Sequence, residues 1–359
     1  MRNPNKILVV IQRSNGDVLL SSSLIKSLFE NFGQPQIDLL VNEDTLEVAK
    51  IIPFTNHIHT FSYKKKRQSK WKQEKKIFVS LYNKYDLSIN LTASDRSVIY
   101  ALLASKNSIS ALENDLKKCW WKKIFLTHHY IFDDTKHILI NNLNSLKCLN
   151  INIDNTHYPI EASRNASSSI EKKLQKLKIH DFIIFHPSAQ YHYKIYPRHL
   201  RNVLLEGLSK LGIPILITGS KNIIDMEIKK QLPILHNVID FIGETSLEEL
   251  IALSKLSLCY IGMDTLNMHI AASQNKRIFT IFGPTNLKMW SPWSNVLKIA
   301  ASKDKPLQTY GNITIFQASL PCVACGKAGC NNKQGRSECL HIIDPKKILH
   351  EVNSWYENA

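Results

Sequence analysis

Short apolar runs, separated by helix-like segments, recur along this chain in two successive series. Each run is rich in Ile, Leu, Val and Phe and has the length of a strand that is buried on both faces of a sheet. The pattern predicts an α/β protein with two doubly wound parallel-sheet domains facing a cleft. The runs of the two series are 7–11, 36–41, 57–61 and 86–91, then 182–186, 213–218, 238–242, 256–261 and 277–282.

A polar segment, Asn152–Ser169, separates the two series and contains Pro159 and the sequence Asn-Ala-Ser-Ser-Ser. Proline and clusters of small polar residues are typical of connections between folded units. We therefore expect an N-terminal domain over residues 1–165 and a C-terminal domain over residues 170–342. The last segment, residues 345–359, is predicted to be a helix.

The composition is that of a globular protein, with 44% hydrophobic residues. No apolar run approaches the roughly 18 residues that a membrane span requires. Residues 1–11 fit a first strand better than a signal peptide, so we expect a cytoplasmic protein.

The formal net charge of +16 is concentrated in two segments that also carry tryptophan, residues 63–76 and 117–125. A solvated lysine-rich face is one explanation; a surface that meets anionic lipid or a phosphorylated substrate is the other. Nucleic acid is not expected as a partner, because the sequence shows no zinc finger or aromatic RNA-binding motif. The candidate surface residues are Arg13, Lys64, Lys65, Lys66, Arg67, Trp120 and Trp121.

The sequence Gln-Arg-Ser-Asn-Gly-Asp-Val follows the first apolar run directly and places Asp17 in the turn between a predicted strand and the helix that follows it. One interpretation is a turn glycine followed by a helix cap. The other is a catalytic carboxylate at the edge of a sheet, where open parallel sheets place their ligands. The residues of this turn alone leave both open.

Three turns of the second half fall just beyond predicted strands, at residues 186–197, 218–222 and 261–273. In the third, Asp264 and Thr265 open a helix that carries His269. Helix N-termini attract phosphate through their free amides and dipole, so a phosphate site is one hypothesis. An aspartate cap with a structural histidine is the alternative.

Four motifs in order resemble glycosyltransferase family 9, the ADP-heptose:lipopolysaccharide heptosyltransferases. Ile-Gly-Met-Asp-Thr-Leu-Asn-Met-His-Ile-Ala-Ala-Ser, followed by Phe-Gly-Pro-Thr and Trp-Ser-Pro-Trp, is similar to the family's D-T-G-x-x-H-x-A-A, F-G-P-T and W-x-P elements. The others are the first strand with its Gly-Asp-Val turn, the His-Pro-Ser-Ala to Lys-Ile-Tyr-Pro element, and Gly-Glu-Thr-Ser-Leu-Glu-Glu-Leu.

The resemblance implies a GT-B enzyme whose first domain binds the acceptor and whose second binds the nucleotide-sugar donor. It implies an inverting, metal-independent transfer, with Asp17 as the general base and Lys194 on the donor diphosphate. It also implies that a C-terminal helix packs back on the N-terminal domain. The remaining donor-binding residues that it implies are Ser188, Ala189, Thr245 (near adenine), Asp264, Thr265 and His269.

The implied donor is ADP-heptose and no further cofactor is required. The implied acceptor is an anionic glycolipid of the lipopolysaccharide inner core, Kdo-lipid A or a heptosyl acceptor. The enzyme would then associate peripherally with the cytoplasmic face of the inner membrane of a Gram-negative bacterium. Two alternatives stay open: a GT-B enzyme that uses a hexose or N-acetylhexosamine donor, and a non-catalytic nucleotide-binding relative.

The sequence departs from the family pattern at two positions. Leu266 stands where the family has glycine after the Asp-Thr pair, and Tyr196 stands where it has tryptophan. A bulky residue is restricted where the backbone approaches a ligand or needs a positive φ. The departure at Leu266 leaves the identity of the donor sugar open.

Four of the seven cysteines cluster near the C-terminus as Cys322, Cys325, Cys330 and Cys339. Four thiols can hold zinc tetrahedrally, and a structural zinc is one interpretation. Reduced structural thiols are the interpretation that we favour, because the last spacing is wider than in a usual zinc ribbon. A redox role is the third.

Overall fold

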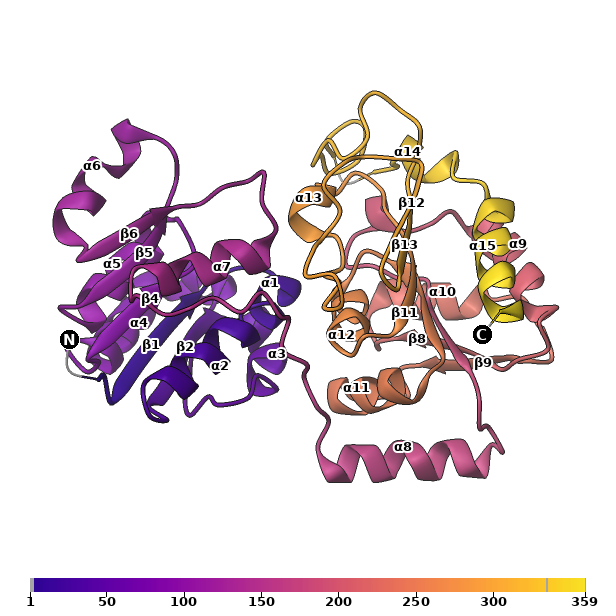
Figure 1. The fold of residues 1–359 in the computed structure, drawn as a ribbon, viewed down its shortest axis with the longest axis horizontal. Helices are drawn as coiled ribbons and strands as arrows, with labels where there is room; N and C mark the ends of the chain where they lie inside the picture. Colours follow the sequence, from indigo (N-terminus) through magenta and orange to yellow (C-terminus); the bar gives the residue numbers. More distant parts are fainter. Residues whose placement is uncertain (1–2, 334, 359) are drawn as a thin grey trace. The chain divides into compact units, whose positions relative to one another are not determined.

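The computed structural model describes residues 3–333 and 335–358, and the side chains of residues 65–70 and 116 lie outside this description. The chain divides into two compact units, Met1–Ile160 and Glu161–Ala359. Each unit is a sheet with helices packed on it (Figure 1). Both sheets are parallel apart from one edge strand, which confirms the predicted α/β class with two parallel-sheet domains.

The first unit contains a six-stranded parallel sheet of order β3-β2-β1-β4-β5-β6. The strand order reverses between β1 and β4, which makes their carboxyl ends the switch point where ligands bind in open α/β sheets. The core strands are buried on both faces, as their apolar sequences predict. The strands are β1 (Lys6–Ile11), β2 (Gln36–Asn42), β3 (Ile58–Phe61), β4 (Leu87–Asn90), β5 (Ser108–Leu112) and β6 (His128–Ile131).

Helices connect these strands. α4 and α5 pack together over Leu8 and Val10 of β1, and α5 and α6 share a smaller apolar cluster around Cys119. α2 packs against α7. The helices are α1 (Asn15–Leu19), α2 (Ser22–Asn31), α3 (Leu46–Lys50), α4 (Tyr63–Leu81), α5 (Asp95–Ala104), α6 (Leu116–Phe125) and α7 (Ile138–Lys147), with a 3-10 turn η1 at Glu43–Thr45.

The second unit contains a seven-stranded sheet of order β12-β13-β11-β10-β7-β8-β9, in which only β12 runs antiparallel to its neighbour. Its switch point lies between β7 and β10. The strands are β7 (Ile183–His186), β8 (Ile215–Gly219), β9 (Val238–Ile242), β10 (Cys259–Met263), β11 (Arg277–Ile281), β12 (Leu307–Tyr310) and β13 (Ile313–Phe316).

One helix of the second unit, α8, begins within the segment that the sequence predicted as a connection. Asn165–Ser169 forms the first turns of α8, because Ser163 caps that helix and Ile170 and Leu174 are buried on one face. The helices are α8 (Arg164–Lys176), η2 (His192–Lys194, 3-10), α9 (Arg198–Ser209), α10 (Ile223–Lys230), α11 (Leu247–Leu256), α12 (Leu266–Ser273), α13 (Leu287–Trp290), α14 (Glu338–His341) and α15 (Pro345–Glu357).

The C-terminal helix α15 contributes to the core of the second unit. Ile348 and Val352 are fully buried in the apolar core of the second unit, and Leu349 packs over Gly207 of α9. The Trp355 ring lies 5.7 Å from that of Phe279 in β11. The apolar face of α15 is therefore part of the core of the C-terminal unit.

Within the described residues, no helix is long and apolar enough to cross a membrane.

Candidate active site

The first site element is the loop between β1 and α1, at the switch point of the first sheet. The backbone amide of Gln12 donates to Oγ1 of Thr92, 3.0 Å away, so this loop is joined to the loop that follows β4. Gln12 directly follows the buried strand β1 and has only 7% of its surface exposed. Neither polar atom of its side-chain amide has a hydrogen-bond partner in the described part of the chain. The signal that could have identified Gln12 is its position as a polar residue directly after an apolar run.

Asp17 lies in the first turn of α1 and is 3% exposed. Its Oδ2 accepts hydrogen bonds from the backbone amide of Ser14 at 3.2 Å and from the Ser14 hydroxyl at 2.8 Å. The same oxygen lies 3.2 Å from Nε of Arg13. Asp17 is therefore a helix-capping carboxylate that also lies at the carboxyl edge of its sheet, where open parallel sheets place their ligands. A helix cap and a catalytic carboxylate are compatible roles at this position.

Arg13, a candidate surface residue, is half-buried. Besides its ion pair with Asp17, its guanidinium lies 5.1 Å from the centre of the Phe132 ring. The amide of Asn42 donates to its backbone carbonyl at 3.3 Å. These contacts from the end of β2 and the segment after β6 hold the Arg13–Asp17 pair in place.

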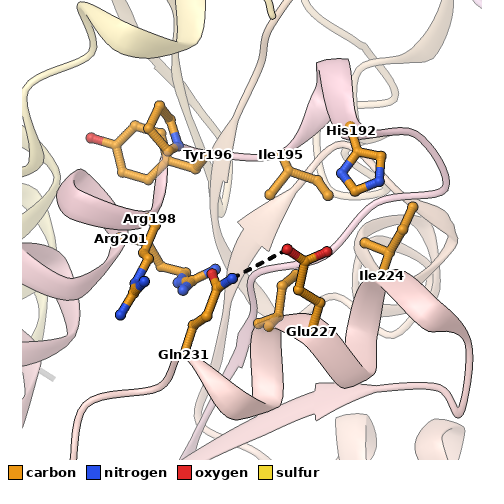
Figure 2. Close-up of a pocket in the computed structure, with 10 residues that line it drawn as sticks. His192, Ile195, Tyr196, Arg198, Arg201, Ile224, Glu227 and Gln231 are labelled. Atoms are coloured by element: carbon orange, nitrogen blue, oxygen red, sulfur yellow. Dashed lines mark hydrogen bonds between the residues drawn. The ribbon is translucent and has the colours of Figure 1, made fainter. Parts of the chain in front are cut away.

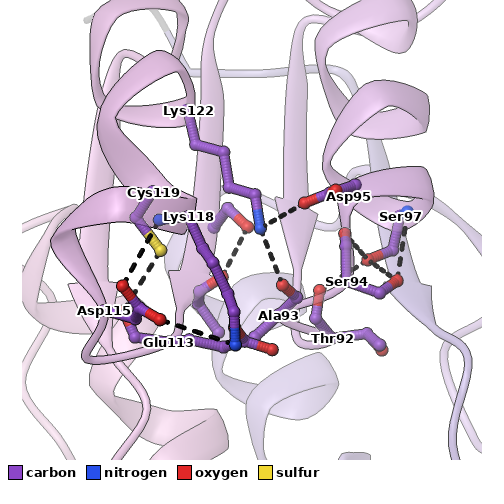
Figure 3. Close-up of polar contacts among 12 residues, drawn as sticks. Thr92, Ala93, Ser94, Asp95, Ser97, Glu113, Asp115, Lys118, Cys119 and Lys122 are labelled. Atoms are coloured by element: carbon purple, nitrogen blue, oxygen red, sulfur yellow. Dashed lines mark hydrogen bonds and ion pairs between the residues drawn. The ribbon is translucent and has the colours of Figure 1, made fainter.

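The loop after β4 is tied to α6 by a buried lysine (Figure 3). Lys122 is 1% exposed, and its Nζ lies 2.7 Å from Oδ1 of Asp95 and donates to the Ala93 carbonyl at 3.1 Å. A buried charge needs such partners. Lys122 thus has a structural role within the basic segment and fixes α6 at the carboxyl edge of the first sheet.

The basic, tryptophan-containing segments prove to be helical. Trp120 on α6 is 63% exposed beside exposed Ile124 and Phe125, whereas Trp121 packs against the cluster around Cys119. On α4, Lys64 and Trp71 are exposed. The predicted surface residues Lys65, Lys66 and Arg67 belong to α4, but their side chains lie outside the described residues.

The second unit places its predicted residues along the carboxyl edge of its own sheet. Ser188 and Ala189 follow β7, are both 4% exposed, and the Ser188 hydroxyl donates to the carboxylate of Asp225. Thr245 is half-buried in the loop between β9 and α11. In that loop Gly243 has a φ of +79°, which favours glycine.

Lys194 and Asp264 form an ion pair that joins the segment after β7 to the residue after β10, with Nζ 3.2 Å from Oδ2. Burial by itself would lower the pKa of Lys194. Attraction to Asp264, a hydrogen bond to its carboxylate and the nearby Tyr193 and Tyr191 outweigh burial, so the pKa lies above its ordinary value. Lys194 therefore carries a positive charge at the switch point of the second sheet.

The N-terminus of α12 lies beside this ion pair. Thr265 is its N-cap residue, with its hydroxyl 3.4 Å from that of Tyr260, and His269 is buried one turn further along. Gly262 in β10 is needed where it stands, because a Cβ there would lie 2.5 Å from the His186 carbonyl oxygen. β10 and β7 thus approach each other closely just before the loops that carry Asp264 and Ser188.

Leu266 begins α12 with a negative φ, so the missing family glycine causes no backbone strain. The next residue, Asn267, has its side-chain amide nitrogen 3.0 Å from Nδ1 of His186, which also contacts the carbonyl and hydroxyl of Thr218. Burial lowers the pKa of His186 to about 4, against the opposing effects of Asp225 and Thr218. This neutral, buried histidine links β7, β8 and α12; the sequence pattern placed it in the His-Pro-Ser-Ala element but assigned it no role.

The four clustered cysteines are free thiols: Cys322, Cys325 and Cys330 are exposed and Cys339 is buried. Burial, and then the nearby thiols of Cys330, Cys325 and Cys322, raise the pKa of Cys339 to about 11. Over residues 3–333 and 335–358, no group of three or more His, Cys, Asp or Glu side chains is placed to hold a metal ion.

Comparison with known proteins agrees with this arrangement. The model of glycosyltransferase family 9 (heptosyltransferase) matches residues 75–317. Lipopolysaccharide heptosyltransferase 3 of Escherichia coli K12 is 26% identical over 307 residues, covering 83% of this chain and 88% of that protein.

Two solved E. coli structures share the fold of the chain. ADP-heptose lipopolysaccharide heptosyltransferase II has a TM-score of 0.71 at 17% identity, covering 99% of this chain and 100% of the other. Heptosyltransferase WaaC with ADP-2-deoxy-2-fluoro heptose has a TM-score of 0.69 at 15% identity, with the same coverage. Because the family model matches more than half of its length, the chain belongs to glycosyltransferase family 9, and its fold is GT-B.

Proposed function

We propose that this glycosyltransferase transfers a heptose from ADP-heptose to the inner core of lipopolysaccharide, in an inverting reaction that needs no metal ion. Two similarities support the choice of sugar and nucleotide: the E. coli relative is a lipopolysaccharide heptosyltransferase, and the WaaC structure contains ADP-2-deoxy-2-fluoro heptose. The structural observation that carries the proposal is the Lys194–Asp264 pair at the N-terminus of α12.

The donor diphosphate would bind at this N-terminus, where free backbone amides attract phosphate oxygens. Lys194 would neutralise the charge that develops on the leaving ADP, and the Thr265 hydroxyl would donate to a phosphate oxygen. Ser188 and Ala189 would line the same site. In this proposal Asp264 and His269 contact the heptose, and the backbone around Thr245 contacts adenine.

Asp17 would act on the acceptor. Its carboxylate takes the proton of the acceptor hydroxyl while that oxygen attacks the anomeric carbon of the donor. The bond from that carbon to the diphosphate oxygen breaks on the opposite face, ADP leaves, and the configuration inverts. One carboxylate is sufficient for this step. The Ser14 hydrogen bonds and the Arg13 ion pair fix its orientation.

The first test offers the purified protein ADP-heptose, UDP-N-acetylglucosamine and UDP-glucose, each with and without a deacylated inner-core acceptor, and measures nucleotide release. We expect acceptor-dependent release of ADP from ADP-heptose alone, unchanged by a chelator such as EDTA. Release of nucleotide from a hexose donor would favour the alternative GT-B activity. Leu266, which replaces the family glycine, would then explain the different donor sugar. Loss of activity in EDTA would contradict the metal-independent step.

The second test is Asp17→Asn, which keeps an oxygen that can accept from Ser14 but removes the base. We expect kcat to fall by about 10²–10⁴-fold, the usual contribution of a general base. Binding of ADP, measured by calorimetry, and the thermal midpoint of unfolding should stay near those of the unmodified enzyme. Wild-type turnover in this variant would reduce Asp17 to a helix cap.

The third test is Lys194→Met, which removes the positive charge beside the proposed diphosphate. A charge-assisted hydrogen bond contributes about 1.5–3 kcal/mol, so ADP should bind at least about tenfold more weakly, and kcat should fall as well. Lys276→Met is the matched control, because Lys276 directly precedes β11 at the opposite edge of the same sheet. Equal affinities of the two variants for ADP would place the donor elsewhere.

We also propose that the first unit meets the cytoplasmic surface of the inner membrane through α6 and α4. Trp120, Ile124 and Phe125 leave more than 60% of their surfaces exposed on α6. Lysines accompany them: Lys117 on α6, and Lys72, Lys75 and Lys76 on α4, are exposed. Aromatic rings at the interface and lysines near anionic headgroups favour such a surface.

The fourth test measures binding to vesicles that contain anionic phospholipid. The double variant Trp120→Ser/Phe125→Ser should bind several-fold more weakly, and binding of the unmodified protein should weaken as salt rises, because exposed charges are screened beyond about 8 Å at physiological ionic strength. The control is Ile234→Ser, a fully exposed apolar residue of the second unit. Binding that responds neither to salt nor to the double substitution would refute the proposal.

A further inference from the structure

A small pocket of about 160 Å³ lies in the second unit between the start of α9 and the helix α10 (Figure 2). His192 and Ile195 close one side, Pro197, Arg198 and Arg201 another, and residues of α10 with Gln231 the third. Among the described residues that line it, neither Lys194 nor Asp264 is present. It is therefore a different cavity from the proposed diphosphate site.

Arg201 is the unusual residue of this pocket, because its side chain is only 1% exposed. Its Nε and Nη2 atoms have no hydrogen-bond partner anywhere in the described chain. Burial, and then repulsion from Arg198, lower its pKa to about 10, and no carboxylate acts in the opposite direction. Buried arginines are ordinarily paired, so a buried guanidinium with two unpartnered nitrogens at the wall of a pocket favours the binding of an anion there.

The acidic residue of the pocket does not supply that anion. Glu227 lies on the exposed side of α10, and its Oε1 accepts from the side-chain amide of Gln231 at 3.3 Å. Glu227 lines the pocket, but within the described chain no ion pair joins it to Arg201 and it does not offset the lowered pKa of Arg201, so the charge of Arg201 stays uncompensated.

The first turn of α9 adds a second, independent preference for an anion. α9 has 12 residues, and its N-cap position is Pro197, whose side chain cannot accept a hydrogen bond from the first amides. Free amides and the helix dipole at such an end favour negative charge. Pro197, Arg198 and Arg201 all line the pocket, so the helix end and both guanidinium groups belong to the same cavity.

We propose that this pocket binds a small oxyanion of the phosphate class, held by Arg201 with Arg198 and the first turn of α9. The planar guanidinium fork matches two phosphate oxygens, and phosphate is small enough for a cavity of this size. The bound anion would neutralise Arg201 and fix the segment 192–198, which also carries Lys194. The site is an addition to the proposed transfer reaction and does not depend on it.

Calorimetric titration of the intact protein with inorganic phosphate, at constant ionic strength, tests the proposal. We expect phosphate binding that weakens by about tenfold or more in Arg201→Met, since a charge-assisted fork is lost. Arg198→Met, a change at an exposed residue that should not affect folding, is expected to weaken binding severalfold. Lys210→Met, at the far end of α9, is the matched control and should bind like the unmodified protein.

Lys194→Met separates this site from the proposed donor site, because it should leave phosphate binding at Arg201 in place. Binding that disappears in Lys194→Met but persists in Arg201→Met would assign the anion to α12 and overturn the proposal, as would no phosphate binding at all. Glycerol phosphate forms a second arm. Affinity equal to that of phosphate would assign the pocket to a phosphoryl group on a larger molecule, and weaker affinity would assign it to the free ion.

The unfolding midpoint gives a further readout. Phosphate should raise the midpoint of the unmodified protein and leave that of Arg201→Met unchanged. Without phosphate, Arg201→Met should unfold at the same or a higher temperature, because a lone buried charge has been removed. A large loss of stability that phosphate does not affect would make Arg201 a structural residue.

Discussion

The parallel direction of neighbouring strands is the constraint on which both units depend. Strands that run in parallel must be connected by helices across the faces, so the strands are buried on both sides and the carboxyl ends share one edge. In the first unit that edge carries Asp17, and in the second it carries Ser188, Asp264 and Thr265. Residues that are far apart in sequence meet there without any long loop having to position them.

Charges near these edges are buried only where a partner compensates them. Lys122 is paired with Asp95, Asp17 with Arg13, and Lys194 with Asp264. Each pair joins two segments that belong to different strand ends or helices, so each also fixes a loop. Removing the partner of such a buried charge leaves that charge buried alone, which costs more than the pair contributes. Arg201 departs from this rule and therefore requires an explanation of its own.

The apolar runs predicted the central strands well, because burial on both faces leaves a continuous hydrophobic sequence. The runs at 7–11 and 182–186 correspond to β1 and β7. β5, β6, β12 and β13 were missed. β5 contains Ser110, whose hydroxyl accepts from the buried Asn90, β6 is a half-exposed edge strand, and β12 and β13 have only four residues each. Polarity that is compensated by a partner distant in sequence cannot be identified from local periodicity.

The candidate site also combines features that the local sequence predicts with features that depend on residues distant in the chain. The positions of Asp17 and Asp264 beyond strand ends follow from the sequence pattern and the resemblance, because strand ends can be located from apolar runs. The cap at Ser14 and the Asn267–His186 contact depend on side-chain directions that only the packed chain defines. Arg201 occupies an ordinary position in an amphipathic helix, and its burial results from packing between α9 and α10 that no local pattern encodes.

The position of α15 has a consequence for the order in which the chain folds. The core of the first unit is built from residues that precede Glu161, so it can form while the rest is still being synthesised. The core of the second unit begins with β7 but includes Ile348 and Val352. Its apolar surface over α9 and β11 stays uncovered until those residues have left the ribosome. During synthesis, the second unit is therefore the part with the longer exposure to aggregation and to chaperones.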